Sequence, residues 1–499
     1  MTLSARAGFV LSTLFIFTAC KATEARKEAS GGEPAVLAWP LSTKSAEART
    51  HFEDGQAAND RGRPLKAYEQ FKRSVAADSA FALGYLGVAQ RALSLDEYRT
   101  NLLRATAYEA GANETEKLLI DIERKEFDRD QQAALALAQQ LAAKQPGNPR
   151  SWWVLAGEYR STGQTEASRA SLKKAIDLAP EYGATHLIYA QDYTVNQPTD
   201  LATAEQQVLA GGKIWPREPL SYDYLGDVRR AQGRLEEAAA AYGRQIELDP
   251  QNFGGYIQRA HSYTFLGKYD KARADYDAAI RVASGNDKVF TARCKAYVSA
   301  FAGNPDDALK QLDQLSQAID GMGVPEPEGE KIETLNSEAI IATYAHRFDI
   351  AEKALGQARP LVLQSVQRVG TPEFRRGQEA GLAYADGIVA AFKGDFAAAD
   401  AKAAEFQKLV AQDRNPTKNR PAHDLRGFVA LFQKRYNDAI AEFDQGSPDN
   451  PFIWYHRALA LEGAGRTDEA KAQFHRVATF NFSVAGYSAV RKDAVAKAG

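Results

Sequence analysis

The chain has 499 residues, of which 62 are Lys or Arg and 64 are Asp or Glu, so its formal net charge is −2. Charged residues make up 25% and apolar residues 44%, which argues against a collagen-like, mucin-like or wholly disordered chain. The near-neutral charge argues against a general nucleic-acid binder, which would carry a strong basic excess. A polytopic membrane protein is excluded, because outside residues 7–19 no apolar run approaches the about 20 residues that a spanning helix needs.

The first 20 residues read MTLSARAGFVLSTLFIFTAC and have the features of an export signal. Residues 7–17 form an apolar stretch of the length found in secretory signals, too short to remain as a membrane span. The stretch ends in Phe17-Thr18-Ala19-Cys20, which resembles a bacterial lipobox. Ordinary signal cleavage near Ala22 is the alternative interpretation.

The lipobox resemblance implies that residues 1–19 are a lipoprotein signal peptide and that Cys20 becomes the first mature residue. Cys20 would carry diacylglycerol and an N-acyl chain such as palmitate. Several acyl chains together anchor a protein stably, at about 0.8 kcal/mol per buried methylene. Lys21 stands where an Asp would favour inner-membrane retention. We therefore expect the protein to be anchored in the outer membrane of a bacterial envelope and to face the periplasm.

Residues 20–44 are polar, rich in small residues and interrupted by Gly31, Gly32 and Pro34. We expect them to be a flexible tether, about 25 Å long root mean square for about 20 residues. The mature chain contains only two cysteines, Cys20 and Cys294. Acylation of Cys20 would rule out a disulfide, and we interpret Cys294 as a small buried apolar residue.

Four series of residues recur at nearly one spacing between residues 146 and 294. A fixed period of this kind predicts a repeat architecture. The prolines step by 34, 36 and 34 residues, and the small and bulky residues keep the same steps. The series are Pro146, Pro180, Pro216 and Pro250; Ala156, Ala190, Gly226, Ala260 and Cys294; Ser168, Ala204, Ala238 and Ala272; and Leu172, Val208, Tyr242 and Tyr276.

Each unit has a simple physical interpretation as a helical hairpin. Apolar spacings of three and four define one face of a first helix, which carries the small residue Gly226. Gly233 lies where a tight turn between helices requires a positive φ. Ala238 and Tyr242 lie one turn apart on the second helix, which Pro250 ends. The small residues allow the helices to approach closely, and the bulky residue fills the next interface.

These units resemble tetratricopeptide repeats, whose 34-residue pattern is W-x2-L-G-x2-Y…A-x3-F…P. The resemblance is strongest over residues 149–286 and implies an all-α solenoid, a superhelix of helix–turn–helix repeats. Weaker units on both sides predict about eleven to thirteen repeats over residues 48–482.

Two polar breaks interrupt the pattern, at residues 321–329 and 412–421. We expect no helix in the first of them. They are either loops inside one solenoid or hinges between stacked sub-arrays. The expected segments are an N-terminal repeat array at 45–318, degenerate repeats at 330–411, a C-terminal repeat pair at 420–482, and a helix at 483–499 that caps the exposed end.

The sequence offers no recognisable catalytic chemistry. It contains no P-loop, G-x-G-x-x-G, G-x-S-x-G or H-E-x-x-H motif. The seven histidines are scattered, and His456 and His475, nineteen residues apart, have no acidic or Cys partner at ligand spacing. We therefore expect neither a catalytic residue, a metal nor a cofactor.

In arrays of this family the first helices line a concave groove, and residues one, five and eight after the packing aromatic face it. The mixed chemistry of these positions suits an extended peptide or a partner helix, and exposed Trp and Arg are enriched in binding hot spots. The alternative is a solvated inner face without a ligand. The predicted groove residues are Trp153, Arg160, Gln191, Asp223, Asp227, Arg230, Ile257 and His261.

The resemblances together predict a lipid-anchored, non-enzymatic scaffold or adaptor for protein or peptide partners in the bacterial cell envelope. One alternative is a peptidoglycan- or carbohydrate-binding array, for which Trp153 and nearby tyrosines are the only indication. Another is an enzyme with a site in residues 287–420. Aromatic-rich grooves also favour self-association, so a homodimer is an alternative to a monomer.

Overall fold

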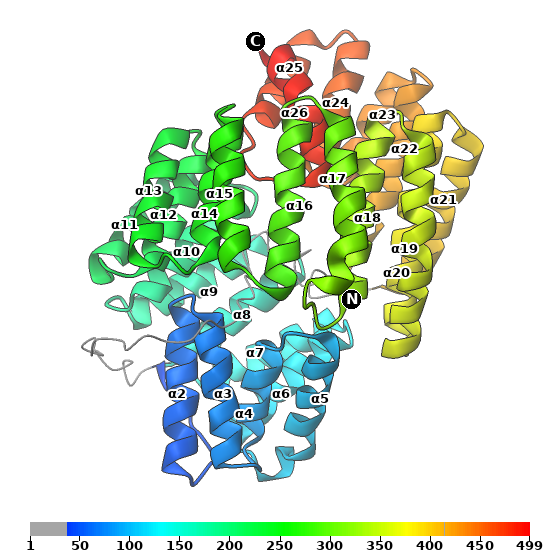
Figure 1. Ribbon diagram of the computed structural model, residues 1–499. Helices are drawn as coiled ribbons and strands as arrows, with labels where there is room; N and C mark the ends of the chain where they lie inside the picture. The colour runs from blue at the N-terminus through cyan, green and yellow to red at the C-terminus, as the bar shows by residue number, and fades with distance from the viewer. Residues whose placement is uncertain (1–36, 414) are drawn as a thin grey trace. The chain divides into compact units, whose positions relative to one another are not determined.

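The computed structural model describes residues 37–413 and 415–499, and all regular structure within them is helical (Figure 1). They contain 25 α-helices and three short 3-10 helices. The chain is an all-α solenoid, as predicted. The expected signal peptide, the lipid site Cys20 and residues 20–36 lie outside the described residues.

The helices divide between two compact units. The N-terminal unit comprises residues 37–229 and 241–251 of the described chain, and the C-terminal unit comprises residues 230–240 and 252–499. The N-terminal unit contains α2 (Ala46–Asp60), α3 (Pro64–Ala77), α4 (Ala82–Gln90), α5 (Leu95–Ala107), α6 (Glu114–Phe127), α7 (Gln131–Lys144), α8 (Pro149–Ser161), α9 (Thr165–Leu178), α10 (Gly183–Val195) and α11 (Leu201–Ile214).

Two helices are shared between the units, α12 (Pro219–Ala231) and α13 (Leu235–Leu248). The C-terminal unit contains α14 (Phe253–Phe265), α15 (Tyr269–Val282), α16 (Gly285–Phe301), α17 (Pro305–Ala318), α18 (Pro327–Tyr344), α19 (Phe348–Val369), α20 (Pro372–Lys393), α21 (Phe396–Val410), α22 (Arg420–Phe432), α23 (Tyr436–Gln445), α24 (Pro451–Gly463), α25 (Thr467–Ala478) and α26 (Ala485–Ala498).

Within each unit, successive helices pair as hairpins and each hairpin stacks on the next. Helix α8 packs on α9 and α10 on α11, and α9 also contacts α10. Among the described residues, eleven such pairs are in contact, from α2 with α3 to α10 with α11 and from α14 with α15 to α24 with α25, while the predicted number of repeats stays a prediction.

The residues of the periodic series form the interfaces between these helices. The small residues Ala156, Ala190 and Ala260 are at most 1% exposed, and the bulky residues Tyr242 and Tyr276 are equally buried. Helices α8 and α9 approach each other closely enough that the Ser168 hydroxyl of α9 donates to the Ala156 carbonyl of α8 at 2.9 Å. Gly233 adopts a φ of 77°, as predicted for the turn. The helix-ending role of the prolines is confirmed too, since α13 ends two residues before Pro250.

The close approach predicts a large difference between two glycine substitutions. A Cβ on Gly226 would lie 2.3 Å from the Tyr242 ring, whereas a Cβ on Gly157 of α8 would meet nothing within 4 Å. We expect Gly226→Ala to destabilise the N-terminal unit by about 1–3 kcal/mol through overpacking. The matched Gly157→Ala should stabilise it by about 0.5–1 kcal/mol, because alanine favours the helix. Urea unfolding of both variants measures the difference, and equal midpoints would contradict the packing.

The two polar breaks are shorter than the sequence suggested. We expected no helix in residues 321–329, but α18 begins at Pro327, because proline at the first helical position has the required φ and lacks an N–H that would have no partner there. In the second break, a 3-10 helix covers Pro416–Asn419 and α22 begins at Arg420. The division of the array into sub-arrays at these breaks stays a prediction.

The last helix packs on more than the last hairpin. Helix α26 contacts α24 and α25, as a capping helix does, but it also contacts α16 and α18 from much earlier in the chain (Figure 1). A Cβ on Gly303, which follows α16, would lie 2.5 Å from the Lys492 ammonium nitrogen of α26. Helix α26 is therefore enclosed within the C-terminal unit rather than only covering its end.

Candidate protein-binding surfaces

The structure separates the eight predicted groove residues into two groups. Five lie in the N-terminal unit, namely Trp153 and Arg160 on α8, Gln191 on α10, and Asp223 and Asp227 on α12. The other three, Arg230, Ile257 and His261, lie in the C-terminal unit. Ile257 is 0% exposed, so its prediction as a partner-contacting residue is wrong. Its apolar side chain belongs to the core instead.

Arg230 and His261 are also buried, and the chain's own C-terminal segment lies over Arg230. They are 2% and 7% exposed. The Arg230 guanidinium lies 4.6 Å from the centre of the Phe482 ring, and the Asn481 amide donates to the Arg230 carbonyl at 3.0 Å. Arg230, expected in an open groove, is therefore a contact of an intramolecular segment, and His261 is buried beside it.

The side chains beneath this segment form a buried polar cluster. The Arg230 guanidinium donates to Gln258 Oε1 at 2.7 Å and to His261 Nδ1 at 3.1 Å. Burial and the neighbouring Arg230 charge hold the pKa of His261 well below its ordinary value. The His261 ring is therefore neutral at neutral pH and accepts the arginine proton.

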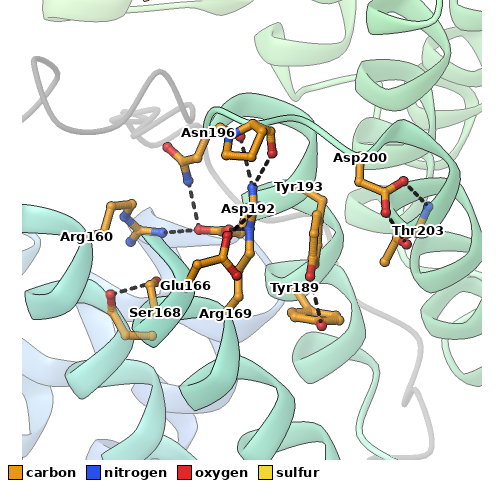
Figure 2. A network of polar contacts seen from close by, with 12 residues as sticks. Arg160, Glu166, Ser168, Arg169, Tyr189, Asp192, Tyr193, Asn196, Asp200 and Thr203 are labelled. Carbon is orange, nitrogen blue, oxygen red and sulfur yellow. Dashed lines mark hydrogen bonds and ion pairs between the residues drawn. The ribbon is translucent and has the colours of Figure 1, made fainter. Parts of the chain in front are cut away.

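In the N-terminal unit, Arg160 belongs to a network centred on Asp192, shown in Figure 2. The Asp192 carboxylate accepts from Arg169 Nε at 3.0 Å, from Arg160 Nη1 at 3.3 Å and from Asn196 Nδ2 at 2.8 Å. Arg169 Nη2 also donates to the Asn196 and Pro198 carbonyls, at 3.0 and 2.7 Å. The network secures the loop after α10 at residues 196–198, so its role is structural.

Asp227 likewise serves packing, because its carboxylate accepts a hydrogen bond from the Tyr242 hydroxyl at 2.6 Å.

Trp153 and Gln191 differ from Arg160 and Asp227 in their hydrogen bonding. Both are half-buried, and among the described residues Trp153 Nε1 and Gln191 Nε2 are buried donors with no hydrogen-bond partner. An unmade hydrogen bond of a buried donor costs about 1–3 kcal/mol. Trp153, Arg160 and Gln191, on neighbouring first helices, form what we call the α8–α10 surface.

Residues 37–43, which we call the N-terminal strap, correct the expectation of a flexible tether up to residue 44. Leu37, Trp39 and Thr43 are buried, whereas Ala38 and Pro40 are exposed. This alternation is that of an extended segment with one face against the protein. Only residues 20–36 remain as the predicted tether.

Side chains at the starts of two first helices hold the strap by its main chain. The Leu37 carbonyl accepts from Arg150 Nε at 3.0 Å, and the Ala38 carbonyl accepts from Asn148 Nδ2 at 3.0 Å. Further along, the Pro40 carbonyl accepts from Asn113 Nδ2 at 2.8 Å. The Ser42 amide donates to Glu116 Oε1 at 2.9 Å and completes this set.

The Leu37 side chain fills an apolar pocket whose walls are fixed by polar contacts. It packs in one cluster with Ala179, Tyr182 and Ala184, and with the partly buried Trp153, Ile188 and Trp215. Asp60 orients two groups beside this pocket, since its carboxylate accepts from Arg150 Nη2 at 2.6 Å and from the Tyr182 hydroxyl at 2.7 Å. Sequence reasoning missed this site, although the pattern Leu37-x-Trp39-x-Leu41 was a strand-like signal.

Aromatic rings of the C-terminal unit surround His456, which is 1% exposed. The His456 ring lies 4.4 Å from the Phe452 ring and 4.9 Å from the Phe428 ring, measured between centroids. His456 Nδ1 donates to the Phe452 carbonyl at 2.7 Å. Burial lowers the pKa of His456 to about 4.

The lowered pKa predicts a specific pH dependence of stability. Between pH 6.5 and 4 the unfolded chain binds a proton at His456 that the folded chain does not, so folding weakens as the pH falls. The loss is about 1.4 kcal/mol per pH unit, or roughly 3 kcal/mol in total. His456→Phe should remove this component, so the stability difference between wild type and variant should change over this pH window. A difference in unfolding free energy that stays constant from pH 7 to 4 would contradict the assignment.

Residues 287–420, where the alternative of an enzymatic site was placed, contain a buried ion pair and a buried thiol. Arg293 Nη1 lies 3.2 Å from Glu330 Oε2, and burial raises the pKa of Glu330 while Arg293 opposes that rise. Cys294 is 2% exposed, and burial raises the pKa of its thiol to about 12. A thiol with this pKa is not a nucleophile at neutral pH.

In residues 37–413 and 415–499, no group of three or more His, Cys, Asp or Glu side chains is arranged to hold a metal ion. No helix in the same residues combines the length and apolarity that crossing a bilayer demands.

Comparison with known proteins gives repeated matches to one family. Residues 149–182, 221–252 and 254–286 match the tetratricopeptide repeat family. A 55-residue stretch is 38% identical to the tetratricopeptide repeat and J domain-containing co-chaperone DNJ1 of Cryptococcus neoformans var. grubii. The match covers 11% of this chain and 10% of that protein, so the chain spans about a tenth of the length of this curated relative.

Several solved structures are similar at low sequence identity. The Cut9–Hcn1 hetero-tetramer of the APC/C is 16% identical, with a TM-score of 0.42, over 90% of this chain and 76% of that chain. A tetratricopeptide repeat protein from Parabacteroides merdae is 14% identical, with a TM-score of 0.34, over 57% and 97%. The type IV pilus biogenesis factor PilW is 16% identical, with a TM-score of 0.34, over 42% and 96%.

Proposed function

Because the chain is a tetratricopeptide-repeat protein, with repeats matched at residues 149–182, 221–252 and 254–286, we propose that it is a lipid-anchored, non-enzymatic scaffold. It would hold protein or peptide partners in the bacterial cell envelope, on the periplasmic side of the outer membrane. Stacked repeats present extended surfaces suited to such binding. A lipid at Cys20 would confine scaffold and partner to one membrane and raise their effective concentration.

The α8–α10 surface is the observation that carries the binding role. Arg160 keeps a 30% exposed side chain, and the neighbouring Trp153 and Gln191 have donors without partners among the described residues. A partner acceptor that reached these donors after a side-chain rotation would recover part of their unmet hydrogen bonding. Trp and Arg are also the residue types that dominate binding hot spots.

Site-specific crosslinking in cells tests the surface. A photo-reactive amino acid replaces Gln191 of α10, and the matched control replaces Lys173 on α9, whose side chain is 63% exposed. We expect a discrete crosslinked protein with the first variant and none with the second. The same product from both positions, or none from Gln191, would count against binding at this surface.

The anchor is tested separately by palmitate labelling and membrane fractionation. The wild-type chain should incorporate labelled palmitate and sediment with outer membranes. Cys20→Ala should lose the label and leave the membrane fraction. Unlabelled wild-type protein would instead support ordinary signal cleavage.

The glycan-binding alternative loses its main indication, because the Trp153 ring is not a free platform. It stacks on the Tyr182 ring with centroids 6.4 Å apart, and the Arg150 guanidinium lies 5.3 Å from its centre. Sedimentation of the purified protein with cell-wall sacculi tests this alternative. Retention that Trp153→Ala abolishes would favour it over the scaffold.

A further inference from the structure

The N-terminal strap is held mainly through groups that every peptide has. The carbonyls of Leu37, Ala38 and Pro40 and the amide of Ser42 make the contacts described above, whereas two of the intervening side chains point to solvent. Recognition of main-chain groups tolerates sequence changes, and specificity then comes from alternate side-chain pockets. The strap thus shows how this surface receives an extended peptide.

The groups that hold the strap are fixed by a second task in their own helices. Asn148 caps α8, since its Oδ1 accepts from the Arg150 amide at 2.9 Å while its Nδ2 donates to the strap. Asn113 caps α6 in the same way, and Glu116 completes the capping box while also accepting from the strap. Because the caps orient these side chains, the surface is preorganised independently of its occupant.

The pocket for Leu37 supplies the selectivity. It has aromatic and aliphatic walls, and Leu37 is completely buried in it. Trp39, two residues later, is 6% exposed and enters the main core cluster of the N-terminal unit. An occupant therefore needs an aliphatic side chain followed, at the second residue after it, by an aromatic one.

We propose that this surface is a recognition site for an extended partner peptide with an aliphatic-x-aromatic pattern, and that the strap is its resident intramolecular competitor. A tethered segment has an effective concentration in the millimolar range, so a free peptide competes poorly until the strap is weakened. The inference rests on the proposed scaffold function and names the chemistry of one partner.

A synthetic peptide with the strap sequence LAWPLST, labelled with fluorescein, provides the probe. Its binding to the full-length mature chain is measured by fluorescence anisotropy. We expect Leu37→Ser, which weakens the strap, to bind the peptide at least about 10-fold more tightly than the wild type. Adding Asn148→Asp to this variant keeps the cap of α8 but removes the amide donor, and should reverse the gain. A peptide with Asp in place of its first leucine, which corresponds to Leu37, should not bind.

Circular dichroism checks that each variant is folded, and Leu37→Ala replaces Leu37→Ser if the latter is not. Equal binding by Leu37→Ser and by Leu37→Ser/Asn148→Asp would overturn the inference, as would no binding by a folded strap variant. Neither outcome decides the scaffold function, because the Gln191 crosslink tests partner binding in cells, whereas the peptide assay tests the Leu37 pocket, with which the α8–α10 surface shares only Trp153.

Discussion

Replacing Asp192 with alanine is expected to destabilise the N-terminal unit by about 3–5 kcal/mol, one of the two largest single-residue effects predicted for this chain. The Asp192 and Arg169 side chains are 1% and 6% exposed, so the substitution leaves a buried guanidinium without its carboxylate. Arg169 also stacks on the Tyr193 ring at 4.1 Å and bonds the Asn196 and Pro198 carbonyls (Figure 2), so it cannot simply turn to solvent. Urea unfolding followed by circular dichroism measures the loss.

Two further variants separate the charge from the packing. Arg169→Met/Asp192→Leu replaces the pair with apolar side chains and should recover most of the loss, since buried ion pairs are often neutral relative to such replacements. Glu166→Gln removes a carboxylate that is 84% exposed and 3.8 Å from Arg169, and should change the stability by less than about 0.5 kcal/mol. If Asp192→Ala were no more harmful than Glu166→Gln, the network would not be the support of this loop.

The repeat architecture could be predicted because packing in a solenoid is local and periodic. The small and bulky residues of the series face each other across neighbouring helices, so one repeating interface leaves one repeating pattern. The pattern weakens where residues other than glycine adopt the positive φ of the turn between helices. Arg129, His346 and Lys434 adopt φ values of 61°, 56° and 62° at turns where Gly233 has 77°. A turn signal that depends on glycine misses these units.

The candidate site was predicted less well, because it depends on contacts between segments far apart in the sequence. The predicted groove positions follow from the family pattern, which assumes that no other part of the chain covers the groove lined by the first helices. Arg230 and Ile257 are instead buried, and Arg230 is covered by Phe482 from the end of the chain. Similarly, nothing local to Asn148 indicates that its amide binds the carbonyl of Ala38, 110 residues away. Only the alternation of apolar residues in the strap gave a local signal.

Replacing Tyr487 with alanine is the second substitution expected to have a large effect, because this side chain joins α26 to the first helices of earlier repeats. It is 0% exposed and lies between the rings of Phe265, Phe301 and Phe480, with centroids 5.3 to 6.3 Å apart. Its hydroxyl donates to the Val477 carbonyl at 2.8 Å. Removing a buried aromatic ring of this size costs about 3–5 kcal/mol.

Tyr487→Phe is the matched control, since it keeps the ring and loses only the hydroxyl, at about 1–2 kcal/mol. The two variants should also differ locally. In Tyr487→Ala, amide hydrogen exchange should accelerate in α26 and in α14, because the ring contact between Tyr487 of α26 and Phe265 of α14 would be lost. In Tyr487→Phe both regions should stay protected. If Tyr487→Ala unfolded at the same denaturant concentration as Tyr487→Phe, with unchanged exchange in α14, then the Tyr487 ring would not be what joins α26 to the earlier repeats.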